Sequence, residues 1–335
     1  MIFMDTVIVK GLSKDYGKER AVDKISFSVK AGEIFGLLGP NGAGKTTTIK
    51  MLTTLLPPTG GNATVAGFDI KEGQNDVRKN IGIVFQDPSL DDELTGRENL
   101  EFHAILYKIG KEKRAKKIAE VLKLVELEDK ADVFVKNYSG GMKRRLEIGR
   151  GLVHEPRILF LDEPTIGLDP QTRRHIWDYI KKLNETKKTT LILTTHYIEE
   201  ADYLCNRVAF VDHGKIVALD TPKALKDKLG GDVISLQVDG EGDNVAFVKS
   251  LKVLKGVKTI LKHDDFIDLT VGEGERRIPE IIVLAEKHKA RITSVNLHKP
   301  SLEDVFIHYT GKKIREETGN AKDNMRTIRS RFSRR

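Results

Sequence analysis

The 335-residue sequence predicts an α/β domain followed by a smaller α+β domain. Up to about residue 228, short apolar runs alternate with helical segments, a pattern typical of a largely parallel sheet covered by helices. One of these runs leads directly into a glycine-rich loop and a helix. From residue 229 to 311 the predicted order is β-α-β-β-α-β, which is that of a ferredoxin-like domain.

The glycine-rich loop reads G-P-N-G-A-G-K-T, which matches the phosphate-binding pattern G-x-x-x-x-G-K-[ST]. It follows the apolar run Glu33–Leu38, predicted as a buried strand, and precedes a helix that begins at Lys45. Glycines let successive backbone N–H groups face one anion, and the helix dipole adds positive charge there. Lys45 can reach the β- and γ-phosphates, and the Thr46 hydroxyl can bind Mg²⁺. The residues predicted to contact the nucleotide here are Gly39, Pro40, Asn41, Gly42, Ala43, Gly44, Lys45, Thr46 and Thr47.

A pair of carboxylates follows the predicted strand Arg157–Leu161. Asp162 is placed to hold Mg²⁺ through water, and Glu163 to orient or deprotonate an attacking water. A carboxylate pair after a strand is moderately specific by itself. At this distance downstream of a phosphate loop it strongly indicates nucleotide hydrolysis.

Two more predicted strands lead to polar residues at the same edge of the sheet. Ile81–Phe85 is followed by Gln86, and Thr189–Thr194 runs on through Thr195 to His196. Side chains beyond the carboxyl ends of parallel strands can reach a common site. We therefore expect His196 to act near the γ-phosphate, whereas Gln86 either reaches that site or is an exposed loop residue.

Two weaker signals add to the expected site. Tyr16 lies upstream of the phosphate loop and either stacks on an adenine ring or is an ordinary turn residue. Ser139 can cap a helix running to about Leu152, and Gly140 with Gly141 leaves that helix end bare for an anion. Taken alone, the Ser-Gly-Gly sequence is common.

The segment from about residue 94 to 152 is predicted to be a helical subdomain. Thr95 and Glu98 have the spacing of a capping box, and Lys111–Val125 carries apolar residues at helical spacing opposite a row of lysines and an arginine. That basic face could contact nucleic acid. A solvated helix face is the favoured interpretation, so we expect no nucleic-acid partner.

The remaining segments complete the predicted fold. Arg207–Asp212 and Lys215–Leu219 read as a hairpin. The second domain is predicted to be closed by a helix at Ser301–Tyr309, and it shows no catalytic constellation, which indicates a regulatory or assembly module. Its other expected elements are strands 233–238, 257–262, 266–271 and 292–298 and helices 244–251 and 279–288.

Composition restricts the class of protein. The single cysteine, Cys205, excludes an internal disulfide and fits a reducing cytosol, and no apolar run approaches the 18 residues of a membrane span. The N-terminus has no basic stretch typical of a signal peptide. The net charge is +8, and the tail from residue 312 to 335 carries most of it. That tail is predicted to be disordered at first, and is either a helix lying on an anionic membrane or a solvated segment.

In order along the chain, these motifs resemble those of the ATP-binding subunits of ABC transporters. Residues 39–47 match the Walker A motif and residues 158–164 the Walker B motif. The signature sequence matches residues 138–142, with Tyr138 and Met142 in place of the commoner Leu and Gln. The other matches are Tyr16 at the adenine-stacking position, Gln86 in the Q-loop, Asp169 in the D-loop and His196 as the switch histidine.

Three further stretches are similar to the daunorubicin-resistance branch of export ATPases: L-P-P-T-G-G, S-L-D-D-E-L-T-G-R-E-N-L and S-L-E-D-V-F-I-H-Y-T-G. The resemblance implies an ABC-type cassette with a mixed sheet and a helical subdomain, binding ATP and Mg²⁺. It implies Glu163, His196, Gln86 and Lys45 as catalytic residues, and Thr46, Gln86 and Asp162 as metal ligands.

The resemblance also implies partners. Two copies would sandwich two ATP molecules, with Ser139 and Gly141 of one copy completing the site of the other; Gly140 and Asp169 are also expected to bind the nucleotide. The dimer would drive a separate membrane permease at the cytoplasmic face, contacted by the loop from Gln86 to Leu94, for export of a drug-like or hydrophobic compound. A soluble ABC ATPase acting on ribosomes or DNA, and a nucleotide-gated regulator without turnover, are the alternatives.

Overall fold

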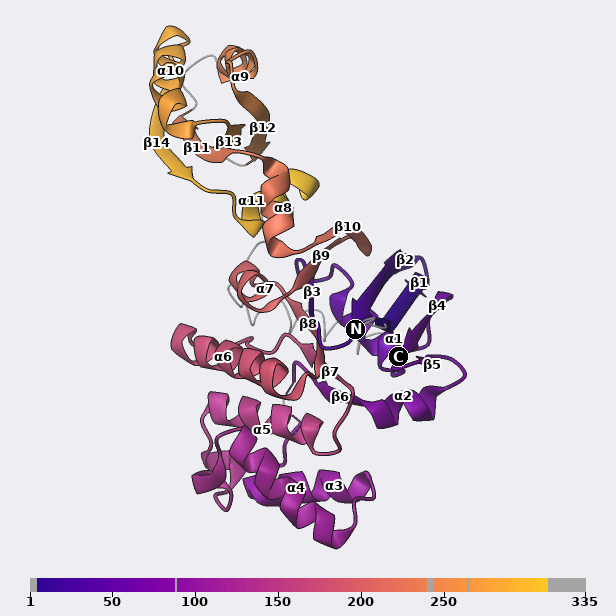
Figure 1. Ribbon diagram of the computed structural model, residues 1–335. Helices are drawn as coiled ribbons and strands as arrows, with labels where there is room; N and C mark the ends of the chain where they lie inside the picture. Colours follow the sequence, from indigo (N-terminus) through magenta and orange to yellow (C-terminus); the bar gives the residue numbers. More distant parts are fainter. Residues whose placement is uncertain (1–4, 88, 240–243, 264–265, 313–335) are drawn as a thin grey trace, which may run out of the picture.

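The computed structural model describes residues 5–87, 89–239, 244–263 and 266–312. The predicted membrane-binding part of the basic tail lies outside these residues, as does Pro88 of the expected permease-contacting loop. Figure 1 shows the C-terminal sheet and the helices α3 and α4 at opposite ends of the molecule. None of the helices in the described residues is long and apolar enough to cross a membrane.

A six-stranded mixed sheet forms the centre of the molecule, in the order β10-β9-β3-β8-β7-β6. Its strands pair in parallel except β10, which is antiparallel to β9 and forms the predicted hairpin with it. The bounds are β3 Ile34–Leu38, β6 Ile81–Val84, β7 Ile158–Asp162, β8 Thr190–Thr195, β9 Arg207–Asp212 and β10 Lys215–Asp220.

A second, antiparallel sheet has the order β2-β1-β4-β5. The largely parallel sheet expected from the alternation of strands and helices is the central one, and the N-terminal strands form this separate sheet. The antiparallel pairing has a local cause: β1 and β2 are long strands joined by a short turn. They pair with each other through several register shifts. The bounds are β1 Asp5–Tyr16, β2 Glu19–Lys30, β4 Gly60–Val65 and β5 Phe68–Asp69.

The central strands are buried on both faces, and alternate residues contribute to two different cores. Phe160 of β7 joins Phe35 and the helix residue Ile49 in the core beneath the antiparallel sheet. Leu159 and its neighbours on the other face pack with the apolar side of helices α5, α6 and α7. This alternation follows from the two-residue period of a strand, which sends successive side chains to opposite faces of the sheet. The helices are α1 Lys45–Leu52, α2 Gln74–Asn80, α6 Pro170–Lys187, α7 Ile198–Leu204 and α8 Pro222–Leu229.

Three α-helices and two short 3₁₀ helices make up the helical region between β6 and β7. Thr95 and Glu98 form the predicted capping box at the start of α3. Helix α4 buries Ile118, Val121 and Leu122, as its apolar spacing predicts. The bounds are α3 Gly96–Leu106, α4 Lys111–Leu124, η1 Glu128–Lys130, η2 Val135–Asn137 and α5 Gly140–Leu152.

The C-terminal sheet has the strand order β12-β13-β11-β14 with every neighbouring pair antiparallel, which is the ferredoxin-like arrangement. Its core is separate from those of the cassette. Helix α10 begins at Gly274 and not at Pro279, which lies inside it. The bounds are β11 Asp232–Asp239, α9 Asn244–Lys252, β12 Val257–His263, β13 Phe266–Val271, α10 Gly274–Lys287 and β14 Arg291–His298.

The last helix, α11 Leu302–Thr310, returns to the cassette. Leu302, Val305 and Phe306 join the core that contains α7 and α8, and the Phe306 ring meets Phe210 of β9 edge-on at 5.7 Å. The helix predicted to close the second domain therefore also packs against the cassette. On the cassette its apolar side chains join a large buried core, whereas the edge strand β14 of the C-terminal sheet leaves Ser294, Val295 and Asn296 exposed.

Candidate active site

The phosphate loop is shaped by glycines that no other residue could replace. A Cβ added at Gly39 would lie 2.1 Å from the carbonyl oxygen of Val211 in β9. Gly44 has a φ of +101°, and a Cβ there would lie 2.4 Å from the carbonyl oxygen of Ala21. Gly44 caps α1, whose first turn contains no acidic residue, so the helix end stays electropositive toward an anion.

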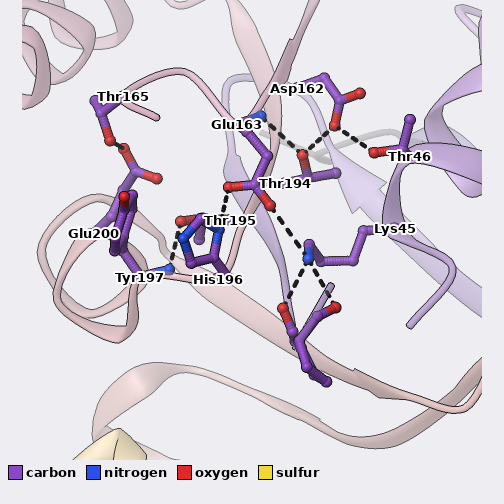
Figure 2. Close-up of polar contacts among 12 residues, drawn as sticks. Lys45, Thr46, Asp162, Glu163, Thr165, Thr194, Thr195, His196, Tyr197 and Glu200 are labelled. Atoms are coloured by element: carbon purple, nitrogen blue, oxygen red, sulfur yellow. Dashed lines mark hydrogen bonds and ion pairs between the residues drawn. The ribbon is translucent and has the colours of Figure 1, made fainter. Parts of the chain in front are cut away.

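Lys45 is buried, and its ammonium group contacts both the loop and the opposite strand. Its Nζ donates to the carbonyl oxygens of Gly39 at 2.7 Å and Pro40 at 3.1 Å, and lies 3.2 Å from Oε1 of Glu163 (Figure 2). Burial lowers the pKa of Lys45, while Glu163 and Asp162 oppose that shift. The ammonium group thus lies between the phosphate loop and the carboxylate at the end of β7.

Asp162 and Thr46 form the oxygen pair expected of a Mg²⁺ site. The Thr46 hydroxyl donates to Oδ1 of Asp162 at 3.0 Å, and the Thr194 hydroxyl donates to the same oxygen at 2.5 Å (Figure 2). Carboxylate and hydroxyl oxygens are hard ligands that suit Mg²⁺, and the residues present therefore fit that ion. The sequence did not identify Thr194 as an orienting residue, although its place opposite Asp162 in neighbouring strands would follow from their parallel register.

Glu163 is a buried carboxylate held on three sides. Its Oε2 lies 2.8 Å from Nδ1 of His196, its Oε1 faces Lys45, and its backbone N–H donates to Thr194 Oγ1 at 3.0 Å (Figure 2). Its φ of 49° is in the left-handed region, which turns the side chain toward the phosphate loop. Burial raises the pKa of Glu163, but the His196 hydrogen bond and the charge of Lys45 outweigh it, so the pKa is lowered overall. The carboxylate is thus ionised at neutral pH.

The structure brings together most, but not all, of the predicted site within one chain. Lys45, Thr46, Asp162, Glu163 and His196 are joined by direct contacts. Gln86 is exposed just beyond β6, whose carboxyl end adjoins that of β7. The half-exposed ring of Tyr16 lies on the hairpin whose second strand contacts Gly44. In the loop itself Asn41 and Gly42 are exposed, Pro40 is half-buried, Ala43 is buried and Thr47 is half-buried on α1.

The Ser-Gly-Gly segment faces solvent at the start of α5. Ser139 caps this helix by accepting from the Met142 N–H at 3.3 Å, as predicted. Ser139 and Gly140 are exposed, and Asp169 caps α6 at the neighbouring helix end. Among the described residues, no hydrogen bond connects this segment to the phosphate loop of the same chain.

A further buried carboxylate, which sequence reasoning missed, lies on the helix that follows His196. Glu200 of α7 is fully buried, and its Oε1 accepts from the Thr165 hydroxyl and the Trp177 indole, each at 2.8 Å. Burial raises the pKa of Glu200, and the hydrogen bonds only partly offset that shift. The signal available in the sequence was its position four residues after His196, on the helix that follows β8.

Comparison with known proteins places the chain in a family. A family model described as ABC transporter matches residues 22–166, and one described as ATP-binding protein DrrA1-3-like, C-terminal domain, matches residues 221–310. The linearmycin resistance ATP-binding protein of Bacillus subtilis is 41% identical over 309 residues, covering 92% of this chain and 99% of that protein. The chain belongs to the ABC transporter ATP-binding family.

Other relatives of this ABC ATP-binding protein extend the match. The daunorubicin resistance ATP-binding protein DrrA2 of Streptomyces coeruleorubidus is 38% identical over 318 residues, covering 95% of this chain and 98% of that protein. A dimeric ATP-binding cassette solved after hydrolysis with ADP and Pi bound is 31% identical, with a TM-score of 0.58 over 64% of this chain and 98% of that one. The expected family, cassette fold and ATPase class are confirmed.

Proposed function

We propose that this chain is the ATP-hydrolysing subunit of an exporter, which dimerises around two ATP molecules and drives a separate membrane permease. The observation that carries the proposal is the buried Glu163 carboxylate, held between His196 and the phosphate-loop lysine. An ionised, oriented carboxylate beside a phosphate site can orient or deprotonate an attacking water. In this role His196 positions the carboxylate, and Lys45 stabilises charge on the phosphate oxygens.

Some residues of the site would bind the nucleotide and Mg²⁺, and others would act in hydrolysis. The glycine loop with Lys45, Thr46 and Thr47 would hold the phosphates, and Tyr16 would stack on the adenine. Thr46, Asp162 and Gln86 would hold Mg²⁺, which supplies positive charge to the phosphate oxygens when bound. Glu163 and His196 would act on the water, with Gln86 near the same position.

The exposed start of α5 supports dimerisation. Ser139, Gly140 and Gly141 form a helix end that offers backbone N–H groups to an anion held elsewhere, and Asp169 lies at the next helix start. A second copy would bring its own γ-phosphate to this end. One phosphate would then be shared by two chains, and its hydrolysis would weaken the contact between them.

The helical region supports docking of a permease. Helix α3 exposes Phe102, Ile105 and Leu106 at helical spacing, and Phe102 and Leu106 are each 61% exposed. A stripe of this kind on a water-facing helix marks an interaction surface. It lies on the helix that follows the predicted contact loop 86–94. Because relatives confer linearmycin or daunorubicin resistance, the cargo would be a drug-like or hydrophobic compound.

Localisation and the tail are separate parts of the proposal. Docking to a permease would place the chain at the cytoplasmic face of the cell membrane, and the basic tail would add contact with anionic lipid at roughly 1 kcal/mol per basic residue near the surface. Removing residues 324–335 should lower binding to phosphatidylserine vesicles and spare ATP turnover. Equal vesicle binding with and without the tail would contradict the lipid contact.

Turnover by the wild-type chain and by Glu163→Gln tests the chemistry. We expect the variant to bind ATP and to hydrolyse it roughly 100-fold more slowly or worse. Glu199→Gln is the matched control, because Glu199 is exposed on α7. Wild-type turnover in Glu163→Gln would show that the assigned base is wrong. Undetectable turnover in the wild type, with tight ATP binding, would favour a nucleotide-gated regulator.

Purification from detergent-solubilised membranes tests the partner. A tagged chain should recover a membrane protein with several spanning helices. Replacing Phe102 and Leu106 of the α3 stripe (Phe102→Ser with Leu106→Ser) should reduce that recovery and leave ATP binding intact. Recovery of ribosomes or DNA without a membrane protein would favour the soluble ABC ATPase.

A further inference from the structure

Arg144, in the second turn of α5, has a buried guanidinium group that uses all five of its N–H donors. The side chain is 8% exposed and its acceptors come from three separate segments. The bonds are Nε to Pro164 O at 2.6 Å, Nη1 to Phe85 O at 2.7 Å and to Glu147 Oε2 at 2.9 Å, and Nη2 to Asp162 O at 3.2 Å and Glu163 O at 3.1 Å.

The carboxylate that pairs with Arg144 extends the contact. Glu147, one turn further along α5 and 2% exposed, accepts the Ser89 N–H at 2.8 Å through Oε1 while Oε2 faces Arg144. The pair therefore contacts Phe85 before Gln86 and Ser89 after it. Through backbone carbonyls it also holds Asp162 and Glu163, the Mg²⁺ ligand and the base of the proposed function.

These contacts connect two functional parts of one chain. Helix α5 begins at the exposed Ser139 cap, five residues before Arg144. Because a helix of 13 residues moves as a unit, a displacement of Gln86 or Glu163 is passed to the Ser-Gly-Gly end. The exposed end and the chain's own phosphate site are then mechanically joined, although no hydrogen bond links Ser139 to the phosphate loop among the described residues.

We propose that Arg144 and Glu147 are a positioning pair that couples the chain's own ATP site to the α5 end that it presents to the ATP of a second copy. The inference rests on the proposed function, because it requires the two-copy arrangement. Neither residue touches the nucleotide in this role. They set the position of Gln86, Asp162, Glu163 and the helix end relative to one another.

The chemistry of the pair makes conservative substitutions informative. A lysine has three donors and no fork, so Arg144→Lys keeps the charge but cannot hold all five acceptors. Glu147→Gln keeps the shape and has one acceptor oxygen, so it can serve Arg144 or Ser89 and not both. Arg145→Lys is the matched control, because Arg145 is the next residue of α5 and its partners, Val125 O, Glu126 O and Glu126 Oε2, lie in the helical region.

The experiment measures ATP-dependent dimerisation of the full chain in the Glu163→Gln background, by sedimentation velocity with Mg²⁺ and saturating ATP. Binding of ADP to each variant, by calorimetry, is the second readout, since ADP lacks the shared γ-phosphate. We expect Arg144→Lys and Glu147→Gln to raise the dimer dissociation constant about tenfold or more and to change ADP affinity less than about twofold. In the wild-type background the same substitutions should lower kcat and leave KM nearly unchanged.

Two outcomes would contradict the coupling role of Arg144 and Glu147, and a third would contradict the proposed function. Dimerisation equal to that of Arg145→Lys would show that the contacts are structural only. Losses of ADP affinity and of dimerisation in the same proportion, in both variants, would show damage to the phosphate site. If the Glu163→Gln parent itself stays monomeric with ATP, the proposed function fails, and that result is distinct from failure of the pair.

Discussion

Nδ1 of His196 lies 2.8 Å from Oε2 of Glu163, although 33 residues separate them in the chain. The contact exists because β7 and β8 are parallel neighbours that end at the same edge of the sheet. With Lys45 on its other oxygen, the carboxylate has one orientation toward the phosphate loop. Substitutions around this contact should therefore separate catalysis from binding.

His196→Asn should lower ATP turnover and spare ATP affinity. The substitution removes the ring contact that orients Glu163 while leaving the phosphate loop intact, and we expect turnover to fall roughly 10- to 100-fold. His288→Asn, at the end of α10 in the C-terminal sheet region, is the control. Steady-state turnover and equilibrium ATP binding check this. A matching loss of ATP affinity would indicate that His196 binds nucleotide directly.

Lys45→Met should weaken ATP binding strongly. The substitution removes a charged donor to phosphate oxygens, and hydrogen bonds to charged groups contribute about 1.5–3 kcal/mol each, or roughly 10- to 100-fold in affinity. Lys50→Met lies on the same helix with its side chain exposed and should bind ATP normally. Calorimetric titration with ATP compares the two. Equal affinities would remove Lys45 from the phosphate site.

Gly141→Ala distinguishes packing from ligand access at the start of α5. A Cβ there would lie 2.6 Å from Cγ2 of Thr172, so the substitution should lower stability, and Thr172→Ser removes the offending methyl. We expect the double variant Gly141→Ala/Thr172→Ser to regain the melting temperature but not turnover, because the bare helix end is needed by a second copy. Recovery of both would assign Gly141 to packing alone.

Acid should destabilise the helical region through the partly buried His103. Burial, with the charges of Arg150 and His154, lowers the pKa of His103 to about 4, against an ordinary value of 6.5. Between those values the unfolded chain binds the proton and the folded chain does not. Stability is therefore fully present above pH 6.5 and falls as the pH drops toward 4, by about 1 kcal/mol per pH unit or less for this partly exposed ring.

Urea unfolding at several pH values between 7 and 4.5 measures that slope. His103→Gln should show a shallower decline of the free energy of unfolding than the wild type, whatever its absolute stability. His288→Gln should keep the wild-type slope. An unchanged slope in His103→Gln would mean that another group controls the acid sensitivity.

Local signals explain why much of the site was predictable. The phosphate loop, Asp162, Glu163 and His196 follow strands in a fixed order, and the parallel register then brings them together. The capping box at Thr95 and the cap at Ser139 are likewise set by neighbouring residues. Whether these residues play the proposed roles stays a prediction, as do the boundaries at residues 228 and 311.

Contacts between residues far apart in the chain could not be predicted from the sequence. The alternation of apolar and polar residues predicts strands, but it does not identify the strand with which each one pairs. It therefore cannot distinguish one sheet from two. Arg144 looks like one charge in a basic run, and only the fold brings five acceptors to it. The buried Tyr138 donates from its hydroxyl to the Lys130 carbonyl oxygen at 2.6 Å, a contact that a leucine could not make.

The return of α11 to the cassette attaches the C-terminal sheet at two points, through α8 where the chain leaves and through α11 where it comes back. With a single connection the sheet could rotate relative to the cassette. The two connections make it move with α7, the helix that begins two residues after His196. A chain cut before Leu302 would leave Phe210 and Leu225 facing water. A chain shortened in this way should therefore aggregate although it keeps every strand of the C-terminal sheet.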